Sequence, residues 1–369
     1  MIYHGTIDQD QIQLGPGRDE VYAYGGDDLI LISSLSEPSL DFQGEIYDGG
    51  DGFDQLFLSG YGGSYDLSKA VLVSIERINL PTAMFASPTT LIMLAEQLPQ
   101  VTTFEFGGWN NVLEVHMGQA SSLNLSSNKF SVFFIFGSRI NVIGDDSNET
   151  VFGSGGSDHI FGGGGNDALG EYVRYFSPAS GYKGDFLYGG EGNDVIIDGV
   201  ANDVIDGGPG IDEIVLKQDF SSTPSVRIDL SVVNAQNTGQ GIDYVSNIEN
   251  VRAGAGNDTI TGSNIANRLD GENGSDQLFG ASGNDTLIGQ SGNDLLVGGL
   301  GSDQIYGGAG ADRLYGQQGS DRLWGGLGSD RFIFSGAMGT GNVDVFLILV
   351  QKTIQYSWTS EFFHRFRQV

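Results

Sequence analysis

The chain has 369 residues, of which 59 are glycine and none is cysteine, and its formal net charge is −30. This charge repels nucleic acids and anionic membrane surfaces, and the lack of cysteine excludes disulfide bonds and thiolate metal sites. No apolar run is long enough to span a bilayer. Because 39% of the residues are hydrophobic, a folded core is expected. A divalent cation is the simplest way to neutralise the acidic side chains of such a fold.

The chain opens with a repeat segment, which we assign to residues 1–57. Three nine-residue units cover 5–31, and a further unit, GGDGFDQLF, follows at 49–57. The sixth position of these units is always aspartate: Asp10, Asp19, Asp28 and Asp54. The first residues, MIYHGTIDQD, lack the cationic start and apolar stretch of a cleaved secretion signal, so any export is expected to use another route.

Residues 58–143 contain no regular repeat. Their alternation of β-branched and aromatic residues with Gly, Asn and Ser predicts strands and turns, and only AEQL at 95–98 hints at a helical turn. Two interpretations of the aromatic residues Tyr61, Phe106 and Trp109 stay open. They are either core and cap residues or a carbohydrate-binding face.

Repeats return in a middle segment, residues 144–215. Position 6 of these units holds Glu149, Asp158, Asp167, Asp185, Asp194, Asp203 and Asp212. A second spacer, 216–252, echoes the first one, because IDLS…VSNIENV parallels YDLS…VSIERINL. The echo predicts two copies of one module, in which repeats are followed by a spacer and then by further repeats.

The longest array contains nine units and covers residues 253–333. Seven of them, from GENGSDQLF at 271 to GGLGSDRFI at 325, follow one another without insertion and have Gly at positions 1 and 4. Position 6 of the array holds Asp258, Asp276, Asp285, Asp294, Asp303, Asp312, Asp321 and Asp330, with Asn267 in the second unit. Position 8 is apolar in each of the seven units: Leu278, Leu287, Leu296, Ile305, Leu314, Leu323 and Phe332.

The physics of the nine-residue unit predicts a fold. Six residues rich in Gly, Asn, Ser and Asp favour a turn, and the last three form a short strand whose middle residue, position 8, points inward. Two units close a coil of 18 residues, and coils stack at about 4.8 Å. The fold class is therefore all-β, a parallel β-roll or β-solenoid interrupted by wider β-rich spacers.

Stacking also lines up the position-6 aspartates in two columns, one on each edge. Two bare carboxylates about 5 Å apart repel by about 0.8 kcal/mol in water and by about 3 kcal/mol at an effective dielectric of about 20. Cations between the turns would reverse this repulsion. Carboxylate and peptide oxygens in a flexible turn suit Ca²⁺ better than Mg²⁺, and zinc is disfavoured because no His or Cys accompanies the turns regularly.

These residues resemble a known family. The unit GGxGxDxUx is the nonapeptide of haemolysin-type, repeats-in-toxin (RTX) proteins of bacteria, and the resemblance is strong over 253–333 and partial over 5–57 and 144–215. It implies several Ca²⁺ ions between turns, held by backbone carbonyls and by the 18 position-6 aspartates. It also implies a secreted, extracellular protein, exported unfolded by type I secretion machinery and folded on meeting Ca²⁺.

Two features of the C-terminal region, the position-9 side chains and the tail, each allow two interpretations. The position-9 side chains of the array should face outward, as partly covered sheet faces or as a docking surface for a partner. The set comprises Phe279, Ile288, Val297, Tyr306, Tyr315, Trp324 and Ile333. The tail, 334–369, loses Gly and Asp after Val345, which indicates either a change of reading frame or a hydrophobic cap on the solenoid.

Catalysis is not expected. The sequence has no H-E-x-x-H, no G-x-S-x-G and no phosphate-binding G-x-x-x-x-G-K-[ST] motif, and Glu105 with Glu114 is the one carboxylate pair we consider in the first spacer. We therefore expect a secreted scaffold, or a surface and adhesion module with a glycan or cell-surface partner. The alternative is the carrier region of a larger secreted enzyme or toxin whose catalytic domain lies outside this chain.

Overall fold

The structure is a computed structural model. It describes residues 1–14, 18–33, 39–59, 63–80, 89–99, 101, 103–106, 111–125, 129–131, 139–153, 157–170, 184–216, 225–333 and 345–347. The chain divides into two units, Met1–Tyr172 with Tyr182–Leu187, and Val173–Gly181 with Tyr188–Val369. The finer division into six segments stays a prediction from the sequence.

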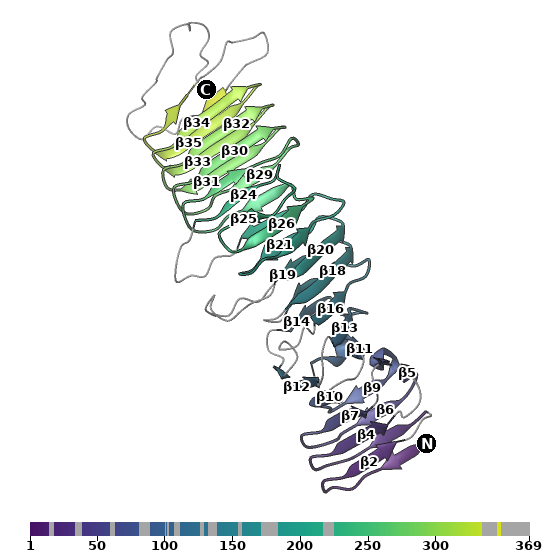
Figure 1. Ribbon diagram of the computed structural model, residues 1–369. Helices are drawn as coiled ribbons and strands as arrows, with labels where there is room; N and C mark the ends of the chain where they lie inside the picture. Colours follow the sequence, from purple (N-terminus) through teal and green to yellow (C-terminus); the bar gives the residue numbers. More distant parts are fainter. Residues whose placement is uncertain are drawn as a thin grey trace, which may run out of the picture. The chain divides into compact units, whose positions relative to one another are not determined.

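Nearly all described elements are short β-strands, whose order along the chain can be followed in Figure 1. The exceptions are two 3₁₀ turns, η1 (Leu67–Lys69) and η2 (Ala95–Gln97). The second confirms the helical turn expected at 95–98. Among the described strand pairs only β25 with β26 is antiparallel. No described helix is long and apolar enough to cross a membrane.

The first unit stacks its strands into several parallel ladders, in which each strand pairs with the next one named. One ladder contains β1 (Ile2–His4), β3 (Glu20–Tyr22), β6 (Ile46–Asp48) and β9 (Val71–Val73). The next contains β2 (Gln11–Leu14), β4 (Leu29–Ser33), β7 (Gln55–Ser59), β10 (Arg77–Leu80), β12 (Thr103–Phe106) and β15 (Lys129–Ser131). A third contains β5 (Ser39–Asp41), β8 (Gly63–Asp66), β11 (Thr89–Leu94), β13 (Val112–His116), β16 (Arg139–Ile143) and β18 (Asp158–Gly164). The last contains β14 (Ser122–Asn124), β17 (Thr150–Phe152) and β19 (Ala168–Gly170).

The second unit repeats this plan, and one of its ladders contains eight strands. One contains β20 (Phe186–Glu191), β22 (Val204–Asp206), β26 (Ile242–Ser246) and β25 (Gln236–Asn237). A long one contains β21 (Val195–Asp198), β23 (Glu213–Leu216), β27 (Asn250–Arg252), β29 (Arg268–Asp270), β31 (Thr286–Ser291), β33 (Gln304–Gly310), β35 (Arg322–Gly328) and β37 (Val345–Leu347). The opposite wall contains β24 (Arg227–Asp229), β28 (Thr259–Thr261), β30 (Gln277–Ser282), β32 (Leu295–Leu300), β34 (Arg313–Gln318) and β36 (Arg331–Phe332).

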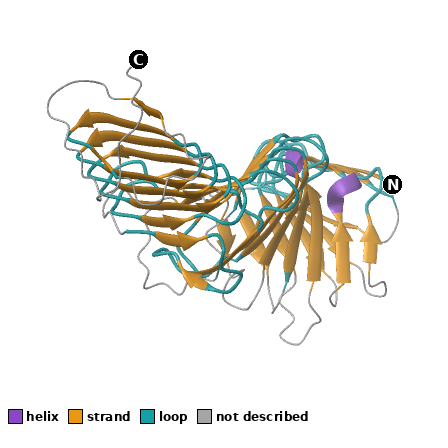
Figure 2. Cartoon of the chain, turned by 90° about the horizontal axis from the view of Figure 1, so that it is seen from above, coloured by secondary structure: helices purple, strands orange, loops and turns teal. Residues whose placement is uncertain are grey.

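The strand register confirms the predicted coil of two nine-residue units. Leu278 lies opposite Leu296 and Leu287 lies opposite Ile305, so each partner is one 18-residue coil away. Figure 2 shows the strands of each unit side by side, with turns at their edges. The position-8 residues form the thin core as expected, because Leu278, Leu287 and their equivalents through Leu314 have no exposed surface.

The first spacer follows the same plan without the nine-residue period. Leu91, Leu113 and Ile140 stack in register on β11, β13 and β16, and all three are fully buried. Tyr61 and Trp109 lie outside the described residues, as does the side chain of Phe106. The choice between core residues and a glycan-binding face therefore stays a prediction.

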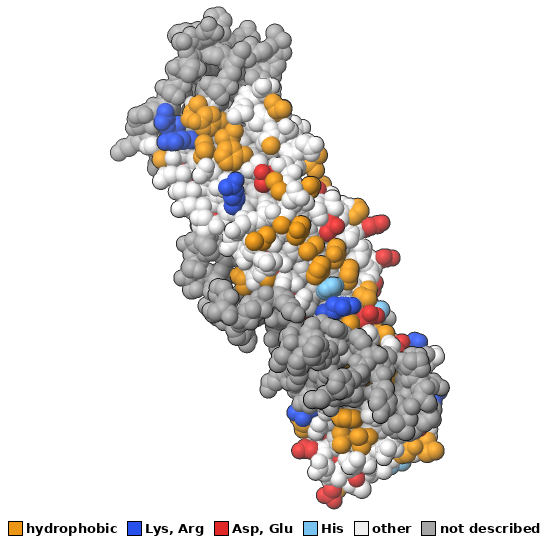
Figure 3. All heavy atoms as spheres, viewed as in Figure 1, with side chains coloured by type: hydrophobic (Ala, Val, Ile, Leu, Met, Phe, Trp, Pro, Cys, Tyr) orange, Lys and Arg blue, Asp and Glu red, His pale blue; other side chains and the backbone are white. Residues whose placement is uncertain are grey.

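The position-9 side chains of the array are half-buried, and the rings of Tyr306 and Trp324 stack at 4.3 Å between their centroids. Figure 3 shows apolar and basic side chains together near the C-terminal strands. In the tail, β37 pairs with β35, so that Leu347 lies opposite Trp324. Residues 348–369 lie outside the described part of the chain, and both interpretations of the tail stay predictions.

Candidate metal centre

The position-6 aspartates lie where each turn enters its strand, and hydrogen bonds link them into columns. On one edge of the long array, the backbone N–H of Asp276 donates to Oδ1 of Asp294 at 2.9 Å, and Asp294 donates to Asp312 in the same way. On the other edge, Asp285 donates to Asp303 at 2.9 Å. One carboxylate oxygen of each aspartate is thus fixed by the preceding coil.

The second oxygen, Oδ2, has a different environment. In five aspartates of the array it is buried and has no hydrogen-bond partner: Asp276, Asp285, Asp294, Asp303 and Asp312. These side chains are at most 2% exposed. A buried anionic oxygen without a partner is costly unless a cation neutralises it. The columns therefore leave one unsatisfied anionic oxygen per turn.

Glycine at position 1 makes room around this oxygen. A Cβ atom on Gly280 would lie 2.4 Å from Oδ2 of Asp285 and 2.5 Å from the carbonyl oxygen of Gly298 in the next coil. The same arrangement recurs at Gly289, with Asp294 at 2.3 Å. A carboxylate oxygen and a peptide carbonyl thus flank a point that any other residue would fill. This all-oxygen donor set fits Ca²⁺.

Without a cation, the columns hold their carboxylates in an unfavourable environment. Burial raises the pKa of Asp276 to about 7, and the neighbouring carboxylates of Asp258 and Asp294 raise it as well. Burial likewise raises the pKa values of Asp285 and Asp312 to about 7. Such carboxylates bind a proton or a cation more readily than exposed ones do.

The other sequence-predicted aspartates occupy equivalent positions within each unit. Asp10 donates to Asp28 at 2.7 Å and Asp28 donates to Asp54 at 2.8 Å. Further links join Glu149 to Asp167, Asp158 to Asp185, Asp194 to Asp212 and Asp258 to Asp276. Asp321 accepts from Asp303, and Asp203 donates to Asp243 of the second spacer.

Three predicted residues lie in less regular surroundings. Asp10 and Asp330 are at the ends of their columns and are partly exposed. Asp19 is buried and pairs with the N-terminal amino group, whose nitrogen lies 3.0 Å from its Oδ1. The surroundings of these three carboxylates therefore differ from those of the carboxylates inside the columns.

The structure also adds acidic residues that the sequence interpretation missed. Glu76 and Glu249 accept hydrogen bonds from the backbone N–H groups of Asp54 and Asp212, and Asp243 accepts one from Asp203, each at 2.8 Å. All three belong to the spacers. A signal was present, because TGQGIDYVS at 238–246 keeps the spacing of glycine and aspartate found in the repeats.

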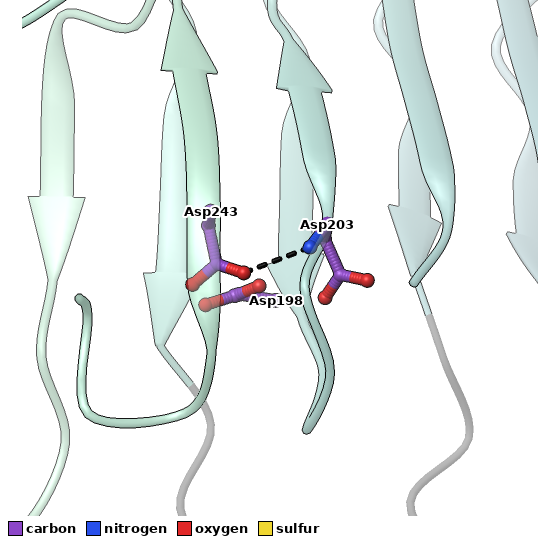
Figure 4. Close-up of side chains that lie close together, drawn as sticks. All are labelled: Asp198, Asp203 and Asp243. Carbon is purple, nitrogen blue, oxygen red and sulfur yellow. Dashed lines mark hydrogen bonds between the residues drawn. The ribbon is translucent and has the colours of Figure 1, made fainter. Parts of the chain in front are cut away.

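One further cluster joins Asp243 to the repeats. The carboxylate oxygens of Asp198, Asp203 and Asp243 lie within 4.8 Å of one another, and all three side chains are buried (Figure 4). Asp198 stands at position 1 of its unit, where the regular repeats have glycine. Burial raises the pKa of Asp243 to about 6, and the charge of Asp203 also raises it. The three oxygens offer a site of the right chemistry for a cation.

Comparison with protein families identifies the repeats. The model of the RTX calcium-binding nonapeptide repeat matches residues 4–31, 143–169, 180–214, 246–278, 262–296, 270–305 and 297–332. No curated protein matches the chain. The RTX repeat is a structural, calcium-binding unit, which supports Ca²⁺ as the cation that the columns fit. The chain thus contains several copies of the RTX calcium-binding nonapeptide repeat.

Proposed function

We propose that the chain is a secreted calcium-binding β-roll protein in which Ca²⁺, held by the position-6 aspartates, drives folding after export. The observation that carries this proposal is the buried, unpartnered Oδ2 of Asp285 and Asp294, each beside a carbonyl oxygen of the next coil. A cation at that place joins two coils and removes the cost of burying the charge.

The energetics favour folding that depends on calcium. The interior of the array is one apolar residue wide per strand, and each coil also buries two carboxylates. Net stabilities of domains are only about 5–15 kcal/mol, so unneutralised acids in successive coils outweigh so thin a core. Extracellular modules bind Ca²⁺ with dissociation constants of about 10⁻⁴–10⁻³ M. The folded state would therefore be populated outside the cell and not in a calcium-poor cytosol.

The folded solenoid would then serve as a scaffold or as a surface module. The regular walls of β-strands present the half-buried position-9 side chains, and the chemistry proposed for the turns is structural. We assign no catalytic residue. His159, which packs on Phe186 at 4.4 Å between ring centroids, has its pKa lowered by burial and is a packing residue.

Isothermal titration calorimetry of the full chain with CaCl₂ tests cation binding directly. We expect several Ca²⁺ ions to bind in the submillimolar to millimolar range, with protons released below about pH 7 because the ligands must be deprotonated. Titration with MgCl₂ is the control and should give little heat. Equal binding of Mg²⁺, or no binding of Ca²⁺ at about 10 mM, would overturn the proposal.

A further inference from the structure

The two spacers share a local structure that meets the end of an aspartate column. The sequence VSIE ends in Glu76 and VSNIE ends in Glu249. Oε2 of each glutamate accepts the backbone N–H of the last aspartate of the preceding repeats, Asp54 or Asp212, at 2.8 Å. Each glutamate therefore stands where the aspartate of the next coil stands inside an array.

The surroundings of both column ends reproduce those of the array interior. Asp54 and Asp212 are fully buried, and Oδ2 of each lacks a hydrogen-bond partner. A Cβ atom on Gly49 would lie 2.5 Å from Oδ2 of Asp54, and one on Gly207 would lie 2.6 Å from that of Asp212. The corresponding distance at Gly280 in the array is 2.4 Å.

At each column end a carbonyl oxygen also lies beside the Cβ position of the glycine, as in the array. The residue that supplies this carbonyl in the spacer is not a glycine. The carbonyl oxygen of Ser74 lies 2.2 Å from the Cβ position of Gly49, and that of Asn247 lies 2.1 Å from the Cβ position of Gly207. In the array this oxygen belongs to the position-1 glycine of the next coil. The spacer backbone thus supplies the carbonyl group that the missing repeat would have supplied.

The spacer backbone is held in an uncommon conformation to do so. Ser74 has φ of 49° and Asn247 has φ of 51°, in the left-handed region that non-glycine residues rarely adopt. The next residues, Ile75 and Ile248, are buried and anchor the turn in the core. Strained backbone that recurs at equivalent positions in two spacers indicates a constraint on where the carbonyl and the glutamate must lie.

The carboxylate column that contains Glu249 is interrupted at the next position, Asn267. At the next position, Asn267 donates a hydrogen bond from its amide nitrogen to the carbonyl oxygen of Glu249 at 2.7 Å. Because the amide nitrogen of Asn267 is a hydrogen-bond donor, it cannot serve as a ligand to a cation between Asn267 and Glu249. Glu249 is therefore the last acidic group before Asn267 in the column that contains Asp194 and Asp212, and carboxylates resume at Asp285, whose Oδ1 accepts the backbone N–H of Asn267 at 2.8 Å.

We propose that Glu76 and Glu249 each complete a terminal calcium site, with Oδ2 of Asp54 or Asp212 and the carbonyl oxygen of Ser74 or Asn247 as further ligands. This inference rests on the proposed calcium binding by the repeats. The proposed site gives each spacer a function at the end of the repeats that precede it. One cation would join the last repeat to the turn of the spacer that carries the glutamate. Neither glutamate belongs to a nonapeptide with glycine at positions 1 and 4.

Counting bound ions in the full chain tests the inference. Equilibrium dialysis against ⁴⁵Ca²⁺ up to about 10 mM, well above the usual affinity of extracellular modules, compares the wild type with Glu76→Gln, Glu249→Gln and the double variant. The matched control is Glu191→Gln, which removes one charge from an exposed side chain at position 3 of a repeat. We expect one ion fewer in each single variant, two fewer in the double variant, and no change in the control.

Far-UV circular dichroism of the same samples follows folding. Glutamine keeps the hydrogen-bond acceptor and removes only the charge, so a double variant that stays unfolded in calcium while the control folds would also support the site. Unchanged ion counts in both glutamine variants of a calcium-binding wild type would overturn this inference alone. A wild type that binds no calcium would overturn the proposed function as well.

Discussion

The long array, 253–333, and the first spacer, 58–143, build similar cores around different turns. Both stack parallel strands with fully buried aliphatic residues, such as Leu278 in the array and Leu113 in the spacer. In the array, successive turns add buried carboxylates. In the spacer, by contrast, Ile140 occupies the register position that Asp158 holds one strand later. The strands β11, β13 and β16 of the spacer thus stack apolar residues, whereas the proposed calcium ions would act on the buried carboxylates of the array.

Chelation should separate the two regions most strongly. In calcium, we expect slow hydrogen exchange of backbone amides throughout both regions. With excess chelator, peptides from 253–333 should lose most of their protection, whereas peptides covering β11, β13 and β16 should keep more of it, because their interior holds no unneutralised acid column. Hydrogen-exchange mass spectrometry of the full chain measures this. Equal loss in both regions would show that the spacer depends on calcium as much as the array does.

Truncation of a core leucine should affect both regions alike. Leu287→Ala in the array and Leu113→Ala in the spacer each remove a fully buried side chain, so each should lower the free energy of unfolding in calcium by about 2–5 kcal/mol. Urea unfolding at saturating calcium gives both values. A change below about 1 kcal/mol at Leu287 would mean that the array interior contributes little beyond its ions.

Replacement of one column aspartate should have opposite effects with and without calcium. Asp303→Asn keeps an acceptor for the N–H of Asp285 but removes a buried charge. We expect a loss of about 1–3 kcal/mol of stability in calcium and a small gain in chelator. Ser302→Ala, on the preceding residue, is the control. Destabilisation in both conditions would identify Asp303 as a purely structural residue.

The pH dependence should also reverse with calcium. Burial raises the folded-state pKa of Asp276, Asp285 and Asp312 to about 7, so the native calcium-free state binds more protons than the unfolded chain between about pH 4 and 7. Its stability is therefore highest at low pH and falls as the pH rises through about 7. Ca²⁺ binds the deprotonated carboxylates. For each proton that Ca²⁺ displaces, its apparent affinity should therefore fall about tenfold per pH unit below about pH 7. Calorimetry at about pH 5, 6 and 7.5 measures the trend, and an affinity that did not change would contradict it.

The sequence predicts the regular part of the molecule in detail. Gly at positions 1 and 4, Asp at position 6 and an apolar position 8 specify an 18-residue coil, and Leu278 opposite Leu296 confirms it. The columns follow because identical units place identical side chains one strand apart. The burial of Oδ2 and the hydrogen bond to Oδ1 depend on the backbone path of the turn, which spacing alone does not determine.

The spacers are less predictable because their coils differ in length. Leu91 pairs with Leu113 and Leu113 pairs with Ile140, so successive partners are unequally separated in sequence and no period reveals them. For the same reason Glu76 and Glu249 escape a search for nonapeptides. Both were visible as an echo between VSIE and VSNIE, but only the backbone shows that each glutamate meets the end of a column.

The most direct test of calcium-driven folding is far-UV circular dichroism of the purified full chain as free Ca²⁺ rises from chelator to about 10 mM, with Mg²⁺ in parallel. Buried, unpartnered carboxylates in successive coils predict a largely disordered spectrum in chelator or Mg²⁺ that becomes β-rich only with Ca²⁺, with a midpoint of about 10⁻⁴–10⁻³ M. A spectrum equally rich in β-structure in chelator would contradict the account, because the apolar core would then stabilise the solenoid without any cation.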